Sequence, residues 1–385
     1  MDIQVYAPES RGTVPPQERL TAVYRIRTTS RDVEARAKAI ALEQSIEMPD
    51  DDVTDPYVRD AVIGQVAEIR PLASDLFEVR ILLAVSTTGL EAGQFMNMLF
   101  GNTSIHEDVQ LADIAVPASV ANAFGGPNHG LAGLRRRAGA ATRALTCSAI
   151  KPQGLAAPAL AAIARRFAEG GIDFVKDDHG LADQAYSPFA ERVRACADAV
   201  AEANAVRGGN TRYVPSLSGN LDRLRRQVEL AVENGIDTVL IAPMVVGLPA
   251  LHALAREYPQ LALMAHPALA GALRIAPPLL LGKLFRLFGA DATIFPNHGG
   301  RFGYTPETCR DLACAARDPW HGLAACAPVP AGGMTTERVG EMLGFYGTDT
   351  ILLIGGNLLA AGDALAGKTA EFAASVAAFP EKRDV

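Results

Sequence analysis

The sequence contains few cysteines, and no two of them form a CxxC pair. Their number, five, is odd, which favours free thiols in a reducing compartment over a framework of disulfide bonds. We expect these residues to act mainly as small buried hydrophobic side chains. The five are Cys147, Cys196, Cys309, Cys314 and Cys326.

The chain also lacks a long apolar run and an excess of positive charge. No apolar stretch reaches the roughly 20 residues that span a bilayer, and residues 1–4 do not begin a basic and apolar leader. A net charge of -7 argues against a nucleic-acid or anionic-membrane partner, although it allows a small basic pocket for phosphate. We therefore expect a cytoplasmic protein that acts on a small molecule.

Lysine is the third scarce residue type. Six of the 36 basic residues are lysines, and two of them, Lys151 and Lys176, end apolar segments that are typical of strands. Arginine stays protonated, whereas a lysine can lose its proton and react as an amine. These two lysines are therefore candidates for chemistry. The other four are Lys38, Lys283, Lys368 and Lys382.

The order of apolar segments predicts two domains. From about residue 145 onward, short strands alternate with helical stretches, which indicates a (βα)8 TIM barrel over 145–385 with a short helical tail. Residues 1–144 predict a smaller α+β domain of the ferredoxin-like type, with strands at 20–27 and 77–84. The expected barrel strands are 145–151, 172–178, 213–218, 238–244, 261–266, 293–297, 325–331 and 350–354.

In such a barrel the active site lies at the carboxyl ends of the strands. Lys151 ends the first strand and Lys176 the second, and neighbouring parallel strands lie about 4.8 Å apart, so one pocket can hold both amines. Crowded cations lower a lysine pKa and increase the fraction of reactive amine. Taken locally, Lys176 with Asp178 and Asp177 is equally consistent with a salt-bridged end of a strand.

The run Gly-Gly-Ile-Asp-Phe-Val-Lys-Asp-Asp at 170–178 resembles the signature of the RuBisCO large-chain superfamily. In that family the lysine captures CO2 as a carbamate and binds Mg2+. Ile150-Lys151-Pro152 resembles the motif that carries a catalytic lysine, and the similarity continues in order over nearly the whole chain. Two further pairs resemble the glycine turns that cradle a substrate phosphate: Gly332 with Gly333, and Gly355 with Gly356.

The resemblance implies a metal site and a dimer. Carbamylated Lys176 and Asp178 would bind Mg2+ through oxygen, and the metal would stabilise an enolate made from a ketose. The segments 41–45 and 100–102 resemble segments that reach into the partner subunit's active site. Glu43 and Asn102 are therefore expected to contact substrate across a homodimer, or a higher oligomer of dimers.

Several positions depart from the family pattern. His179 replaces the glutamate at the third metal-ligand position, which favours a borderline transition metal or an acid-base role for the imidazole. Gln153 replaces a second lysine and Ala331 a serine. His266 is kept, but residues 267–270 lack the arginine and the second histidine that follow it in the family. Arg301 replaces the loop lysine, and its guanidinium can form bidentate hydrogen bonds with a carboxylate or a phosphate.

These losses argue against carboxylation of ribulose bisphosphate and indicate a RuBisCO-like protein of the form IV type. Because Arg301 can anchor an additional carboxylate, we expect decarboxylation or C-C cleavage of a 3-oxo sugar-acid phosphate, of the 3-oxo-isoapionate 4-phosphate kind. One alternative is an isomerase or enolase of a substrate like 5-methylthioribulose 1-phosphate. The other is a non-catalytic binding module.

The resulting candidate site has three parts. The expected catalytic residues are Lys151, His179, His266 and Arg301. The expected metal ligands are Lys176, Asp178 and His179. The expected substrate and phosphate contacts are Glu43, Asn102, Gln153, Gly332, Gly333, Gly355 and Gly356.

Two other motifs received weaker interpretations. The loop 125–130 has the composition of a phosphate loop, but a structural turn is favoured because no strand clearly precedes it. His298, which lies near Arg301 in the chain, is predicted equally well as a substrate contact or as a solvated loop residue.

Overall fold

The computed structural model describes residues 18–380, so the prediction made for residues 1–4 lies outside the described part. The chain forms two compact units, one extending to Gly125 and including Leu273–Ala276, the other made of Gly126–Ala272 and the chain from Pro277 onward. This division lies earlier than the predicted boundary between residues 144 and 145. The reason is the 125–130 turn, which the barrel holds: the N-H groups of His129 and Gly130 donate to Asp291 Oδ1 over 2.7 and 2.6 Å.

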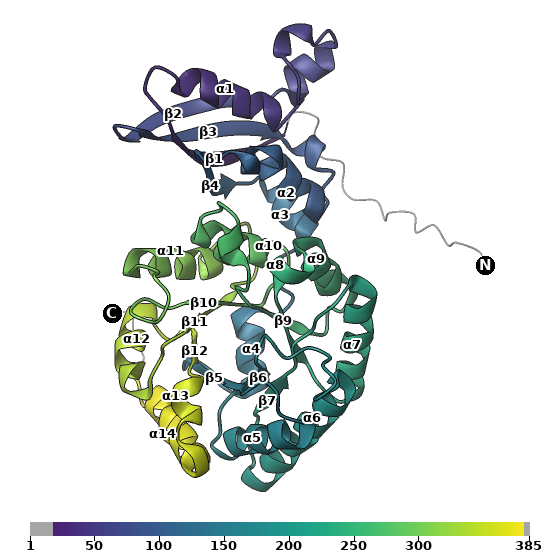
Figure 1. The fold of residues 1–385 in the computed structure, drawn as a ribbon, viewed down its shortest axis with the longest axis vertical. Helices are drawn as coiled ribbons and strands as arrows, with labels where there is room; N and C mark the ends of the chain where they lie inside the picture. The colour runs from purple at the N-terminus through teal and green to yellow at the C-terminus, as the bar shows by residue number, and fades with distance from the viewer. Residues whose placement is uncertain (1–17, 381–385) are drawn as a thin grey trace, which may run out of the picture. The chain divides into compact units, whose positions relative to one another are not determined.

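The first unit is a four-stranded antiparallel sheet with strand order β2-β3-β1-β4, accompanied by helices. In chain order it reads strand, helix, two strands, helix, strand, which confirms the ferredoxin-like prediction (Figure 1). Alternate residues of β1, such as Tyr24 and Ile26, are buried, as a half-covered sheet requires. The elements are β1 (Arg19–Arg27), α1 (Val33–Glu43), β2 (Gln65–Ala73), β3 (Leu76–Ala84), α2 (Ala92–Phe100), β4 (Val109–Ala115) and α3 (Ala118–Phe124).

The second unit is an eight-stranded barrel, and all eight predicted strands are confirmed. Two parallel four-stranded sheets, with orders β12-β5-β6-β7 and β11-β10-β9-β8, make up its wall (Figure 1). A bridge between Ser216 and Leu240 joins them where β7 meets β8. The strands are β5 (Leu145–Ile150), β6 (Phe174–Asp177), β7 (Arg212–Val214), β8 (Thr238–Ile241), β9 (Ala262–Ala265), β10 (Ala292–Pro296), β11 (Ala327–Ala331) and β12 (Ile351–Leu353).

Helices cover the outside of the strands in Figure 1. Within residues 18–380, none is long and apolar enough to cross a membrane. The helices of this unit are α4 (Gly130–Ala138), α5 (Ala157–Glu169), α6 (Phe189–Arg207), α7 (Leu221–Glu233), α8 (Pro243–Val246), α9 (Leu248–Glu257), α10 (Phe285–Leu287), α11 (Pro306–Arg317), α12 (Val339–Tyr346), α13 (Gly356–Leu359) and α14 (Leu365–Ala377).

Two prolines explain why β11 and β12 are not hydrogen-bonded to each other within one sheet. Ala327 donates its N-H to Asp291 O on the β10 side of the strand, so the alternating positions Pro328 and Pro330 are directed toward β12. Proline has no N-H and cannot donate to a neighbouring strand. The side-chain hydroxyl of Thr350 instead donates to Pro328 O over 2.9 Å.

The barrel interior is a hydrophobic cluster to which every barrel strand contributes, including Cys147 of β5 and Phe174 of β6. Side chains alternate along a strand, so the residues two positions further on, Ala149 and Lys176, also point inward. These two are register partners. The barrel therefore places Lys176 one layer above its apolar core, and Asp178 follows on the same side.

Asp177 takes the opposite side of β6 and is fully buried against α6. Its carboxylate accepts hydrogen bonds from Arg192 Nε (3.1 Å), Tyr213 OH (2.7 Å) and Ser216 N (3.0 Å). Arg192, also fully buried, donates further to Ala182 O and Ser187 O over 2.7 and 2.8 Å. This pair joins the end of β6 to the loop that follows it.

Replacing Arg192 by methionine is expected to destabilise the barrel by about 3–5 kcal/mol, because it leaves the Asp177 carboxylate buried without its ion-pair partner. Chemical denaturation would measure the change. The matched control is Arg225→Met, which breaks an ion pair with Glu257 whose side chains are 38% and 37% exposed and should cost about 0–1 kcal/mol. Equal losses in the two variants would contradict the account.

Candidate active site

A cavity of about 930 Å³ lies at the carboxyl ends of the barrel strands. Its lining comes from strands β5, β6, β10, β11 and β12 and from segments that follow the barrel strands, including the loop after β9. The predicted residues among the lining are Lys151, Lys176, Asp178, His179, His266, Arg301, Gly332, Gly333, Gly355 and Gly356. The barrel thus brings together most of the predicted site.

Lys176 is an almost fully buried amine, with 3% of its surface exposed. Burial lowers its pKa, and the nearby ammonium of Lys151 acts in the same direction, while the carboxylates of Asp178 and Asp177 oppose it. Lys176 Nζ donates to Asp177 O over 2.9 Å. The site therefore favours the uncharged amine more than water does.

Asp178 and Lys151 form an ion pair, in which Lys151 Nζ contacts Asp178 Oδ2. Burial by itself raises the pKa of Asp178, but the hydrogen bond from Lys151, the N-H of Gly180 and the charge of Lys176 outweigh it and lower the pKa to about 2. The Gly180 N-H lies 3.1 Å from Oδ1. Asp178 is thus an anion over the physiological pH range.

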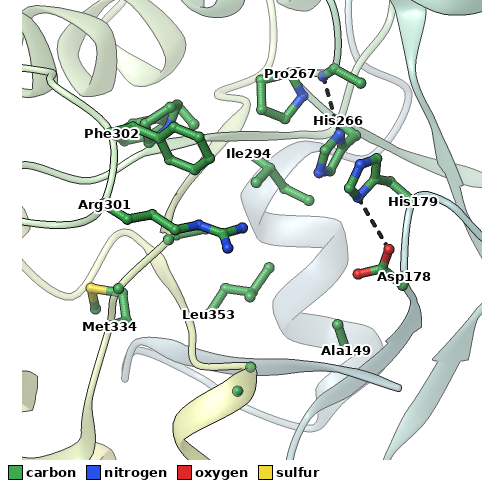
Figure 2. A pocket seen from close by; sticks show the side chains of 18 of the residues that line it. Ala149, Asp178, His179, His266, Pro267, Ile294, Arg301, Phe302, Met334 and Leu353 are labelled. Atoms are coloured by element: carbon green, nitrogen blue, oxygen red, sulfur yellow. Dashed lines mark hydrogen bonds and ion pairs between the residues drawn. The ribbon is translucent and has the colours of Figure 1, made fainter. Parts of the chain in front are cut away.

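His179 and His266 stack with ring centroids 4.1 Å apart and planes 9° from parallel (Figure 2). Ala268 N-H donates to His266 Nδ1 over 3.1 Å, so the proton of the neutral ring is on Nε2. Burial lowers the pKa of His266 to about 2 and also lowers the pKa of His179. His266 is therefore a neutral hydrogen-bond donor.

His179 lies beside the charged side chain of Asp178. Its Nδ1 is 3.4 Å from Asp178 Oδ1, a distance at which a hydrogen bond is weak. Because burial disfavours the imidazolium, the neutral ring of His179 can accept a proton or supply a lone pair.

Arg301 lies across the cavity from His179 and His266 and provides a cation there (Figure 2). Figure 2 shows its side chain directed toward the middle of the cavity, and its guanidinium lies over the Phe302 ring at 4.9 Å from the centroid. A guanidinium with free donors is suited to an anionic substrate group.

Of the two glycine turns, the one after β11 leaves no room for a side chain at Gly333, whereas the one after β12 is open at Gly356. Gly332 and Gly333 have φ angles of 83° and 81°, and a Cβ on Gly333 would lie 2.9 Å from the Cα of Gly300. The turn after β11 therefore packs directly against the Arg301 loop. Gly355 borders Lys151, since a Cβ on it would lie 4.0 Å from Lys151 Cε.

Three predicted contacts lie outside the cavity lining. Gln153 is exposed, and its side chain covers Gly180, where an added Cβ would clash with it. Glu43 and Asn102 belong to the first unit, where Asn102 Nδ2 donates to Glu43 Oε1 over 2.8 Å. Their role in a partner subunit's site stays a prediction.

The two weaker motifs are structural. The 125–130 loop binds the chain's own Asp291 carboxylate, as described above, so its N-H groups serve a turn. His298 packs its ring 4.5 Å from that of Phe345 and is not among the cavity-lining residues.

Sequence reasoning missed the apolar part of the lining. Its side chains come from four strands and from loops, among them Ile294 of β10, Leu353 of β12 and Met334 after the first glycine turn (Figure 2). Ile294 and Leu353 occupy inward positions that the strand alternation could have identified. Met334 carries no such signal.

The donor set fits Mg2+ under one condition. No three His, Cys, Asp or Glu side chains of the described chain converge on a metal position, so the encoded groups offer the Asp178 carboxylate and the His179 imidazole. The uncharged amine of Lys176 is the form that bonds to the carbon of CO2 and loses a proton, which would make it a carbamate anion. With that change, two hard oxygen ligands are present.

The comparisons with known proteins agree with the geometry. Residues 130–304 match the family "Ribulose bisphosphate carboxylase large chain, catalytic domain". The chain is 59% identical to a 5-methylthioribulose-1-phosphate isomerase of Rhodospirillum rubrum, over 94% of this chain and 96% of that one. It is 34% identical to a 2,3-diketo-5-methylthiopentyl-1-phosphate enolase of Geobacillus kaustophilus, over 72% and 69%.

A solved structure has the same fold. The crystal structure of a RuBisCO-like protein from Rhodopseudomonas palustris superimposes with a TM-score of 0.89 at 50% identity, covering 95% of this chain and 99% of that one. The identity and the coverage together establish the family. The chain belongs to the RuBisCO large-chain superfamily and is a RuBisCO-like protein of the form IV type.

Proposed function

We propose that this protein is an isomerase of 5-methylthioribulose 1-phosphate. The observation that carries the proposal is the divided lining of the cavity, which joins a charged group of Lys151, Lys176, Asp178 and Arg301 to an apolar surface. A sugar phosphate with a thioether end has the same division. The similarity to the R. rubrum isomerase supports this choice.

The expected decarboxylation or C-C cleavage of a 3-oxo sugar-acid phosphate finds no support among these relatives. It rested on Arg301 as the anchor of an additional carboxylate. The same guanidinium suits a phosphate or an enolate oxygen, so its presence does not require a sugar acid.

Isomerisation of a ketose phosphate moves a proton between neighbouring carbons. A base breaks the C-H bond beside the carbonyl, the electron pair forms an enediolate, and an acid returns a proton at the adjacent carbon. In this proposal the neutral imidazole of His179 accepts the proton, and the Lys151 ammonium, held by Asp178, returns one. No atom leaves the substrate, so the product has the same mass.

The other residues bind and orient. Backbone N-H groups at Gly332, Gly333, Gly355 and Gly356 would hold the phosphate, and the Nε2-H of His266 would donate to a substrate oxygen. We propose that carbamylated Lys176 and Asp178 hold Mg2+, and that His179 keeps its lone pair for the proton transfer instead of serving as a third ligand. The chemistry that Mg2+ supplies in such a site is polarisation of the substrate carbonyl.

The test is proton NMR of 5-methylthioribulose 1-phosphate in D2O with protein, Mg2+ and bicarbonate. The unmutated protein should replace a substrate C-H by deuterium and form an isomer. Lys176→Ala should slow this exchange about 100-fold or more, since it removes the predicted carbamate. Lys368→Ala, which changes an exposed lysine paired with Glu371, should leave the rate unchanged.

Equal exchange by the Lys176→Ala variant would contradict the role given to Lys176. Absence of exchange with the folded, metal-supplied protein would contradict the isomerase proposal. In that case, saturable binding of the same compound would favour the non-catalytic binding module.

The resemblance also implies a shared site in a homodimer. Lys176→Ala and Asn102→Ala chains should each have low activity alone, and mixed dimers should recover part of it, because one of the two shared sites keeps both residues. Activity assays on heterodimers purified with two different tags would measure the recovery. Failure of verified heterodimers to recover activity would contradict a shared site.

A further inference from the structure

The loop that follows β9 forms an apolar wall of the cavity. Five consecutive residues after His266, Pro267 to Gly271, line it, and none has a charged or hydrogen-bonding side chain. In Figure 2, His266 and Pro267 lie on the other side of the cavity from Met334, which follows the first glycine turn. The wall is therefore separated from the proposed phosphate position.

Leu269 is the unusual residue of this wall. Its φ is 62°, in the left-handed region that residues with a Cβ rarely adopt. Its side chain is 60% exposed, so the apolar surface that it shows is little used in folding. Hydrogen bonds on either side hold the turn, from Ala270 N to Pro267 O (2.9 Å) and from Ala272 N to Leu269 O (3.0 Å).

A glycine would occupy this conformation without strain. A leucine that is both strained and exposed at the edge of a cavity contributes little to stability, and strained residues of this kind cluster at ligand-binding sites. The side chain therefore points to a use in binding.

We propose that Leu269, with the apolar wall at 267–271, binds the methylthio end of the substrate and selects it over a hydroxyl. The inference rests on the proposed function and extends it to the residue that determines specificity. An apolar wall gives a thioether methyl group favourable contact, whereas a hydroxyl placed there loses hydrogen bonds to water.

The experiment compares 5-methylthioribulose 1-phosphate with ribulose 1-phosphate, which has a hydroxyl in place of the methylthio group. For Leu269→Ala and Leu269→Gly, kcat/KM for the thioether substrate should fall about tenfold, while kcat/KM for ribulose 1-phosphate should change little. Leu269→Gly should unfold at the same or a higher denaturant concentration, because it relieves the backbone. The control is Val245→Ala, an equally exposed apolar residue at 57% that does not line the cavity.

Two results would overturn the inference alone. One is an equal fall for both substrates, which would indicate a general disturbance of the site. The other is no change for either substrate in the Leu269 variants of an active protein. Unmutated protein that turns over neither substrate would overturn the proposed function together with this inference.

Discussion

The alternation of side chains at the end of β6 is the constraint on which the site depends. Lys176 and Asp178 can face the cavity only because Asp177, between them, faces the other way. Its carboxylate is held by Arg192, Tyr213 and Ser216. The side chains of Asp177 and Arg192 are both fully buried. A shift of the strand by one residue would exchange the two sides and place a carboxylate where the amine now lies.

This constraint also sets the electrostatics of the cavity. Lys176 stands directly above an apolar core, so its charge is disfavoured, while Asp178 stays ionised beside Lys151. His179 and His266 are neutral because burial lowers the pKa of each imidazole. The barrel therefore presents within one pocket an amine whose pKa is lowered, a carboxylate and two neutral imidazoles, and proton transfer beside a ketose carbonyl requires groups of these kinds.

The sequence predicted the barrel well because each strand is a short apolar segment that ends in polar residues or glycine. The same rule pointed to Lys151, Lys176, Asp178, His179 and His266, which line the cavity, since each lies at or just after the end of a strand. The rule could not exclude Gln153, which continues the first of these segments but turns away to cover Gly180.

Features that depend on distant parts of the chain were not predictable. The ion pair of Asp177 with Arg192 joins a strand to a helix that begins after a loop, and nothing local marks the partner. The two units divide earlier in the chain than predicted, because His129 and Gly130 bind Asp291, which is far away in the sequence. The left-handed backbone of Leu269 has no sequence signal, because leucine is not a residue that marks such turns.

We propose that the barrel holds Lys176 as an amine ready to take up CO2 beside Asp178. The most direct measurement is 13C NMR of the protein in 13C-labelled bicarbonate with Mg2+, compared with the Lys176→Ala variant. A protein-bound carbamate signal should appear in the unmutated chain and be absent from the variant. A fully active protein without that signal, or a signal of equal strength in the variant, would contradict it.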